Sequence, residues 1–298
     1  MVERASRISV VQHQQRIARV DLITVLALLA ITGALLYRGL DFYSQDLQDR
    51  VSHPDFRVLG PGEIVGHGYG IVGTFLIFTN LLYLARRRFA AWHLGSMRAW
   101  LNMHVFTGLS GSLLVAFHSA FQLRTPIATF TASALFCVVL SGLIGRYLHS
   151  LAPQSDRPRF LDAIAQLEAH ALGAAAVLKD TVAALPPPAE PRRATLLDAV
   201  SMMPTWRRQA RLRRERMRTA LAGLVRQSQV AETQRVALQK LCDEVVKLAA
   251  EPVRTHAADC VLRSWRSLHR FAAVLMILAV SVHIVVAWVL GFRWIWSS

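Results

Sequence analysis

The sequence predicts an all-α integral membrane protein, a bundle of five transmembrane helices with a cytoplasmic helical insertion between the fourth and fifth helices. Hydrophobic residues make up 53% of its 298 residues, which is more than an ordinary soluble domain contains. Five apolar stretches are long enough, as helices, to cross a hydrocarbon core of about 30 Å. A long polar stretch rich in Ala, Leu, Glu and Arg separates the last two of them and favours further helices.

The five spans are expected near residues 20–40, 63–85, 99–122, 127–148 and 269–291. The first span resembles a signal peptide, but no small-residue cleavage site follows it, so we interpret it as a retained anchor. The predicted domains are a cytoplasmic segment (1–19), the first four spans (20–149), the insertion (150–268) and the fifth span with a short extracytoplasmic tail (269–298).

Arginines predict the orientation, because cytoplasmic loops retain an excess of Lys and Arg. They cluster before the first span, between the second and third spans and after the fourth, whereas the loop after the first span is acidic. This pattern predicts a protein of the cell (inner) membrane with the N-terminus and the insertion inside and the C-terminus outside. It also accounts for the formal charge of +15, so we expect no nucleic-acid partner. The basic run at 206–218 is most simply a solvated helix face, with lipid headgroups or a docking protein as alternatives.

Within the insertion, the proline-rich run at 185–191 must interrupt any helix. We expect helices near 160–184 and 195–268 that pack as a hairpin or small bundle. The second should continue into the fifth span, since neither Gly nor Pro occurs from Ala257 to Val289.

Cysteine spacing excludes several classes of site. Cys137, Cys242 and Cys260 form neither CxxC nor CxxCH, which argues against a disulfide framework and against covalently attached haem. Within the insertion, His170, His256, Cys242 and Cys260 are too scattered to predict a metal site. Because no glycine-rich nucleotide fingerprint is present, redox equivalents must come from another polypeptide.

Two histidine pairs carry the chemistry. His104 and His118 in the third span are 14 positions apart, and so are His269 and His283 in the fifth. Fourteen residues of helix return to within about 40° of the starting direction and rise about 21 Å, so each pair lies on one face near opposite leaflets. Both spans start inside and run parallel, which brings His104 level with His269 and His118 level with His283.

Two bis-histidine sites follow from this arrangement, since haem iron accepts neutral imidazole from both sides. We therefore expect two low-spin haems b that carry electrons across the bilayer. Gly108 and Gly111, on the His104 face, would give the macrocycle space, and Arg98 and Arg270 are candidates to bind propionates at the inner side.

His67 and His149 are possible alternates. Either could replace a ligand, line a quinone site or take protons, although a solvated interfacial histidine is the commoner case. The glycines at 66, 68, 70 and 73 more often serve close helix packing than chemistry.

With these spacings the third to fifth spans resemble the di-haem transmembrane cytochrome b superfamily, which includes the ferric reductase and NADPH oxidase type and, more distantly, the cytochrome b of quinol-oxidising complexes. The resemblance implies that His104, His118, His269 and His283 ligate two haems b, and it implies quinone as a partner. The chain departs from the family in three ways: it lacks the fused flavin and nicotinamide domains, it lacks the Pro-Glu-Trp-Tyr quinol motif, and it carries the insertion.

The expected function is that of a cytochrome b subunit linking a quinone pool or cytoplasmic donor to an extracytoplasmic acceptor. Such a chain is an electron-transfer subunit rather than a stand-alone enzyme, with a flavoprotein, iron–sulfur protein or multihaem cytochrome as partner. Two alternatives are a membrane-anchored sensor or scaffold with no cofactor and a stand-alone quinol-linked ferric or superoxide reductase.

Overall fold

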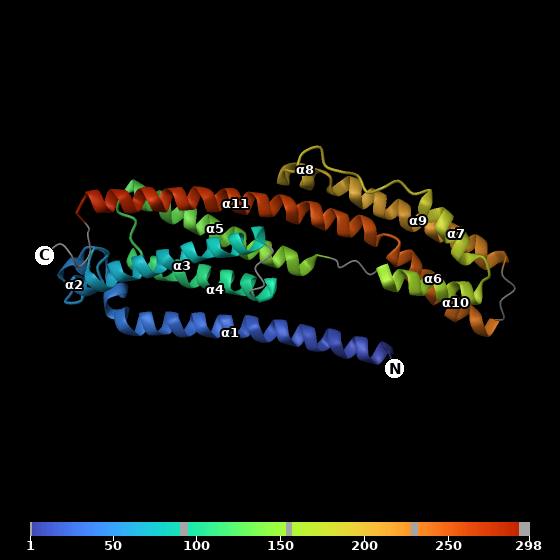
Figure 1. Ribbon diagram of the computed structural model, residues 1–298, viewed down its shortest axis with the longest axis horizontal. Coiled ribbons are helices and arrows are strands. Elements are labelled where there is room, and N and C mark those ends of the chain that lie inside the picture. The colour runs from blue at the N-terminus through green and yellow to red at the C-terminus, as the bar shows by residue number, and fades with distance from the viewer. Residues whose placement is uncertain (1, 90–94, 153–156, 228–231, 292–298) are drawn as a thin grey trace. The chain divides into compact units, whose positions relative to one another are not determined.

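The computed structural model describes residues 2–89, 95–152, 157–227 and 232–291, with side chains for 22–89, 95–152, 157–226 and 235–291. The side chains of the predicted N-terminal segment and the last residues of the tail lie outside these ranges. Most of the described residues are helical, and none of them belongs to a strand (Figure 1). The elements are α1 (Val2–Ser44), η1 (Asp49–Ser52), α2 (Phe56–Leu59), α3 (Ile64–Arg88), α4 (Met97–His118), α5 (Pro126–Leu151), α6 (Arg157–His170), α7 (Ala174–Ala183), α8 (Leu196–Ser201), α9 (Met203–Gln227), α10 (Glu232–Leu248) and α11 (Glu251–Val289).

Among the described residues, five stretches of helix are long and apolar enough to cross a membrane, as the sequence predicts. They are Leu22–Ser44, Phe56–Arg88, Met97–His118, Pro126–Leu151 and Arg235–Val289. Large apolar side chains on them face outward, for example Phe75, Phe136 and Val274, each of which is about two-thirds exposed. Side chains of this kind match a lipid environment rather than water.

Helix α4 ends at His118, four residues before the end of the predicted third span. Ala120 (φ 46°) and Phe121 (φ 57°) adopt left-handed backbone conformations, which stop the helix. A buried arginine, Arg50, then holds the turn by donating from Nη1 to the carbonyl oxygen of Ala120 at 2.6 Å. His118 is therefore the last residue of a helix rather than a residue within one.

The insertion contains more helices than the two predicted. Gly173 (φ 86°) separates α6 from α7, and the predicted helix 195–268 is divided into α8, α9, α10 and the first part of α11. The proline-rich segment is non-helical, and α11 runs without a break through Ala257–Val289, both as predicted. Helices α6, α7, α9 and α10 enclose an apolar core that includes Leu167, Leu178, Met217 and Leu238.

Two compact units make up the chain. The first comprises residues 1–142 and 272–298, and the second comprises Leu143–Phe271. Helices α5 and α11 each contribute residues to both units. His104, His118 and His283 belong to the first unit and His269 to the second.

In the first unit, α3 and α4 pack with their backbones in contact through glycines. A Cβ atom added to Gly73 would lie 2.8 Å from the carbonyl oxygen of Gly111, and one added to Gly111 would lie 2.7 Å from that of Gly73. The backbones of α4 and α11 lie farther apart than those of α3 and α4. The glycines thus hold α3 directly against α4.

An aromatic cluster covers the end of α4 where His118 lies. Its fully or nearly fully buried members are Phe42, Tyr43, Leu59, Phe117 and Ala120. Arg50, only 6% exposed, donates to the carbonyl oxygens of Gln45, Ala120 and Tyr43 at 2.9, 2.6 and 2.5 Å. This guanidinium therefore ties the end of α1 to the turn that follows His118.

Candidate functional site

The imidazole of His118 is held against α3. Its Nδ1 atom lies 2.9 Å from the carbonyl oxygen of Gly66. A Cβ atom on Gly70, one turn later in α3, would lie 2.8 Å from both Cγ and Nδ1 of the ring, so only glycine leaves space there. The close approach of α3 therefore sets the orientation of this ring.

The bond to Gly66 also selects the tautomer of His118. A carbonyl oxygen can only accept, so Nδ1 must carry the proton and donate it. In neutral imidazole the second nitrogen, Nε2, then keeps its lone pair. Histidines that ligate metals are commonly oriented in this way, with one ring N–H donated to a backbone carbonyl.

His283 on α11 is the second imidazole at this position. It lies close enough to His118 for the two rings to interact electrostatically. The Nδ1 atom of His283 is buried without a hydrogen-bond partner among the described residues. Because buried polar atoms are nearly always satisfied, an unpartnered imidazole nitrogen here is a candidate ligand atom. Of the two predicted pairs, only His118 and His283 belong to the same compact unit.

His67, one of the predicted alternates, lies beside this pair. Its ring centroid is 6.0 Å from that of His118, with the planes at 66°. Three imidazoles from α3, α4 and α11 therefore occur at this end of the first unit. His149, the other alternate, is exposed near the end of α5.

The surroundings of His104 are formed by α3. Its ring centroid lies 5.1 Å from that of Tyr83, and one turn along α4 the hydroxyl of Thr107 donates to Asn80 Oδ1 at 2.9 Å. His269 is partly exposed and belongs to the second unit, so its pairing with His104 stays a prediction.

The other predicted site residues occupy the following positions. Gly111 faces α3 at Gly73, and a Cβ atom on Gly108 would lie 3.3 Å from Asn80 Nδ2, so both glycines lie on the α3 side of α4. Arg98 is exposed in the first turn of α4. Arg270 is exposed in the second unit, where its Nε donates to the carbonyl oxygen of Arg266 at 3.3 Å.

No family model, curated protein or solved structure matches this chain. Two neighbouring imidazoles, one with its proton fixed on Nδ1 and one with an unpartnered buried nitrogen, form a donor set that suits axial ligation of haem iron.

Arg86 belongs to the arginine cluster between the second and third spans, from which the sequence predicts the membrane orientation. It is 9% exposed, and its Nε is buried without a hydrogen-bond partner among the described residues. Arg86 follows Tyr83 by one helical turn, so it lies on the face of α3 that contacts His104. The sequence carries no signal for this burial, because Arg86 stands beside Arg87 and Arg88 in one basic run.

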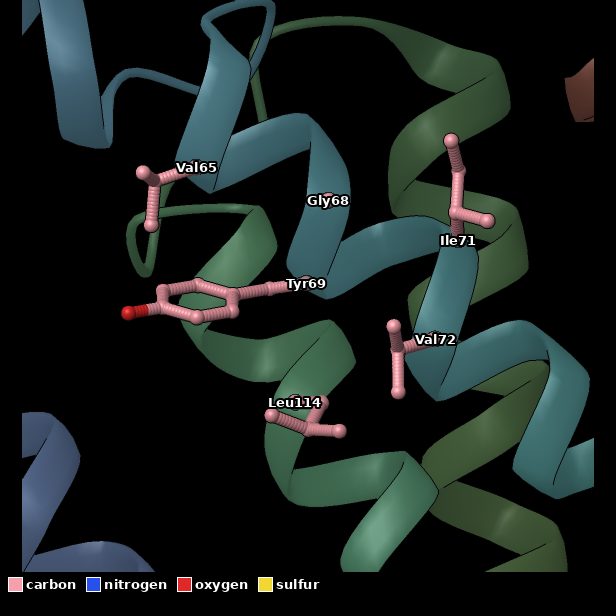
Figure 2. A pocket seen from close by; sticks show the side chains of 6 residues that line it. All are labelled: Val65, Gly68, Tyr69, Ile71, Val72 and Leu114. Carbon is pink, nitrogen blue, oxygen red and sulfur yellow. The ribbon is translucent and has the colours of Figure 1, made fainter.

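An open apolar groove runs along α3 and α4 in the first unit. Its volume is about 420 Å³. Figure 2 shows Val65, Tyr69 and Val72 following one face of α3, with Leu114 of α4 beside them. Gly68 and Ile71 complete the lining. The groove falls within the usual size range of small-molecule sites, about 300–1,000 Å³.

The sequence predicts no metal site in the insertion, but the structure brings two of the residues considered there close to a third possible ligand. His256 and Cys260 lie four residues apart on α11 and meet Glu190 from the proline-rich segment, so three possible ligand atoms lie together. The sequence could not predict this group, because Glu190 is distant from the other two residues along the chain and only the tertiary structure brings it close to them. His170 and Cys242 are not part of this group.

Proposed function

We propose that this protein is a membrane cytochrome b subunit that carries electrons across the bilayer through two bis-histidine haems b. One observation carries the proposal: the ring of His118 is fixed by Gly66 and lies near His283, whose Nδ1 is buried and unpartnered. A scaffold without a cofactor gives no reason to keep an imidazole nitrogen buried and unsatisfied.

The two haem sites use the residues predicted from the sequence. His118 and His283 would hold the haem near the extracytoplasmic side, and His104 and His269 would hold the one near the cytoplasmic side. Haem b, when bound, supplies a one-electron carrier with no open coordination position. The chain's own residues orient the ligands: Gly66 fixes the tautomer of His118, and Gly70 leaves space for its ring.

Arg86 is our candidate partner for a propionate of the haem near the cytoplasmic side. Its guanidinium is mostly buried and has an unpartnered N–H among the described residues, one turn from the tyrosine that contacts His104. A carboxylate would satisfy that donor with a charge-assisted hydrogen bond. Arg98 and Arg270 are both exposed, which makes them weaker candidates.

Quinone is the proposed small-molecule partner. The groove along α3 has an almost wholly apolar lining suited to an isoprenoid chain, and Tyr69 adds an aromatic ring with a hydroxyl. The same helix carries His67 next to Gly68, so α3 contributes both to the groove and to the group of three imidazoles. An exchange of electrons between quinone and the haem held by His118 is consistent with this placement.

We place the protein in the cell membrane with the N-terminus and insertion in the cytoplasm. Because the chain lacks a nucleotide fingerprint, it acts as an electron-transfer subunit with a flavoprotein, iron–sulfur protein or multihaem cytochrome as partner. The insertion folds around an apolar core of its own, which makes it our candidate element for docking such a partner.

The test is a reduced-minus-oxidised absorption spectrum and an electron paramagnetic resonance spectrum of the purified full chain. We expect about two low-spin haems b per chain. His118→Ala and His283→Ala should each remove or convert the same haem, and the double variant should lose only that haem. His104→Ala and His269→Ala should affect the other haem, and His170→Ala is the matched control at an exposed histidine. A colourless protein under all redox conditions would overturn the proposal and favour the scaffold.

A further inference from the structure

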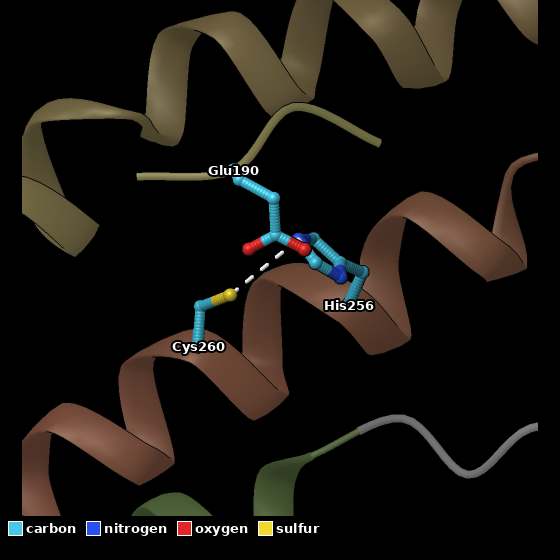
Figure 3. Close-up of side chains that lie close together, drawn as sticks. All are labelled: Glu190, His256 and Cys260. Atoms are coloured by element: carbon cyan, nitrogen blue, oxygen red, sulfur yellow. Dashed lines mark hydrogen bonds and ion pairs between the residues drawn. The ribbon is translucent and has the colours of Figure 1, made fainter. Parts of the chain in front are cut away.

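Three side chains with different ligand atoms meet in the second unit, away from the membrane spans predicted from the sequence (Figure 3). The Nε2 atom of His256 lies 3.5 Å from Sγ of Cys260 and 3.5 Å from Oε1 of Glu190. All three ligand atoms lie within 4.8 Å of one another. A nitrogen, a sulfur and an oxygen donor therefore surround one point.

Two of the three ligand atoms belong to residues on one face of α11. His256 and Cys260 are four residues apart, the spacing that places side chains one above the other on a helix. Cys260 is 4% exposed and packs in a small apolar cluster with Trp206, Ala250 and Val253. The ring of Trp206 also lies edge-on to that of His256 at 6.1 Å. Helix geometry and packing thus hold these two donors in place.

The third donor comes from the proline-rich segment, which α9 holds in position. Trp206 Nε1 donates to the carbonyl oxygen of Ala189 at 2.8 Å, and the amide N–H of Ala189 donates to Gln209 Oε1 at 3.1 Å. Arg213 donates to the carbonyl oxygen of Pro186 at 2.7 Å. These bonds fix the backbone next to Glu190, whose own side chain is 71% exposed and can adjust to a ligand.

We infer that Glu190, His256 and Cys260 form a zinc site that fastens the proline-rich segment to α11. Zinc bonds of about 2.3 Å to sulfur and 2.0 Å to nitrogen, at a tetrahedral angle, place these two atoms about 3.5 Å apart. That separation equals the distance between Cys260 Sγ and His256 Nε2. The N, S and O donors match the ligands that Zn²⁺ takes in proteins, and three of them leave one tetrahedral position for solvent.

Charge balance agrees with a divalent ion. On binding, the Cys260 thiol loses its proton to solvent and bonds zinc as thiolate, while Glu190 is already a carboxylate and His256 binds as neutral imidazole. Two negative charges then neutralise Zn²⁺. The competing interpretation is a hydrogen-bonded trio with no ion, which gives the same contacts but no affinity for metal.

Equilibrium dialysis of the tag-free, thiol-reduced full chain in detergent against buffered Zn²⁺ separates the two interpretations. Zinc and iron are measured in the same sample by mass spectrometry, so the iron content reports on the haem proposal independently. We expect one zinc per chain. X-ray absorption at the zinc edge should show one sulfur near 2.3 Å and nitrogen or oxygen near 2.0–2.1 Å.

Single substitutions assign the ligands. Cys260→Ser, His256→Gln and Glu190→Gln should each weaken zinc affinity at least about tenfold, while Cys242→Ser, His170→Gln and Glu215→Gln should bind zinc as the unchanged protein does. Far-UV circular dichroism checks that each variant keeps its helix content. Failure of the unchanged chain to bind zinc would overturn the inference, as would a sulfur scatterer that persists in Cys260→Ser.

Discussion

The Nδ1 atom of His118 lies 2.9 Å from the carbonyl oxygen of Gly66, and the ring fits because Gly70 has no side chain. One helix, α3, thus sets both the tautomer and the position of a proposed haem ligand on α4. This relationship makes a glycine on a neighbouring helix a positioning residue for the site.

Gly70→Ala should displace the His118 ring, because the new Cβ would lie 2.8 Å from ring atoms. We expect conversion or loss of the low-spin signal of the haem held by His118 and a stability loss of about 1–3 kcal/mol, the usual range for overpacking. Electron paramagnetic resonance and thermal unfolding measure the two effects. Gly68→Ala is the matched control, since nothing lies within 4 Å of its added Cβ. An unchanged Gly70→Ala spectrum would contradict the positioning role.

Gly73→Ala and Gly111→Ala should each force α3 and α4 apart, since the added Cβ meets the backbone of the other helix at 2.8 or 2.7 Å. Backbone cannot move aside as a side chain can, so we expect a loss of about 1–3 kcal/mol in the free energy of unfolding. Unfolding in mixed micelles measures it. Gly33→Ala in α1, where nothing lies within 4 Å, should be neutral, and equal stability of all three variants would argue against the glycine contact.

Arg50→Ala should destabilise the turn after His118. The substitution leaves three carbonyl oxygens without their donor, two of them in buried hydrogen bonds, at a cost of about 2–4 kcal/mol. The melting temperature of the purified chain is the measurement. Arg57→Ala, at an exposed arginine of the same loop region, should change it little. If Arg50→Ala melts at the same temperature as the unchanged chain, water replaces these hydrogen bonds.

Arg86→Gln should lower the midpoint potential of the haem held by His104 and His269. A nearby positive charge favours the reduced haem, so its removal should shift the potential by roughly −50 mV, the equivalent of about 1 kcal/mol of charge interaction. Redox titration followed by absorbance measures the shift. Arg88→Gln, at an exposed arginine two residues later, is the control. If Arg86→Gln and Arg88→Gln have the same midpoint potential, Arg86 does not interact with this haem.

Glu168 should make the stability of the second unit depend on pH. Hydrogen bonds from the backbone N–H groups of Ala175 and Gly173 hold the pKa of its carboxyl below the ordinary value of 4.5. A lowered folded-state pKa contributes stability that is present above pH 4.5 and is lost as the pH falls through the folded-state value. Thermal unfolding between pH 7 and pH 3 should show this loss in the unchanged chain and a weaker pH dependence in Glu168→Gln. Glu215→Gln should behave as the unchanged chain does.

Much of the helical framework could be predicted from the sequence because it depends on local properties. Runs of apolar residues long enough to span a membrane require helices, and the prolines at 186–188 exclude a helix whatever surrounds them. The spacing from His104 to His118 places both on one face of α4 by helix geometry alone. By contrast, the end of α4 at His118 depends on Arg50, which reaches Ala120 from 70 residues away.

The sequence by itself determined which helices could span a membrane and which histidines share a helix face, because both follow from residue-by-residue periodicity. Only the tertiary structure decided what those histidines meet: the Gly66 carbonyl that orients His118, the burial of Arg86 and the approach of Glu190 to His256 and Cys260. These contacts join residues from different segments, and their geometry depends on how closely the helices pack. Local sequence patterns carry no information on the distance between packed helices.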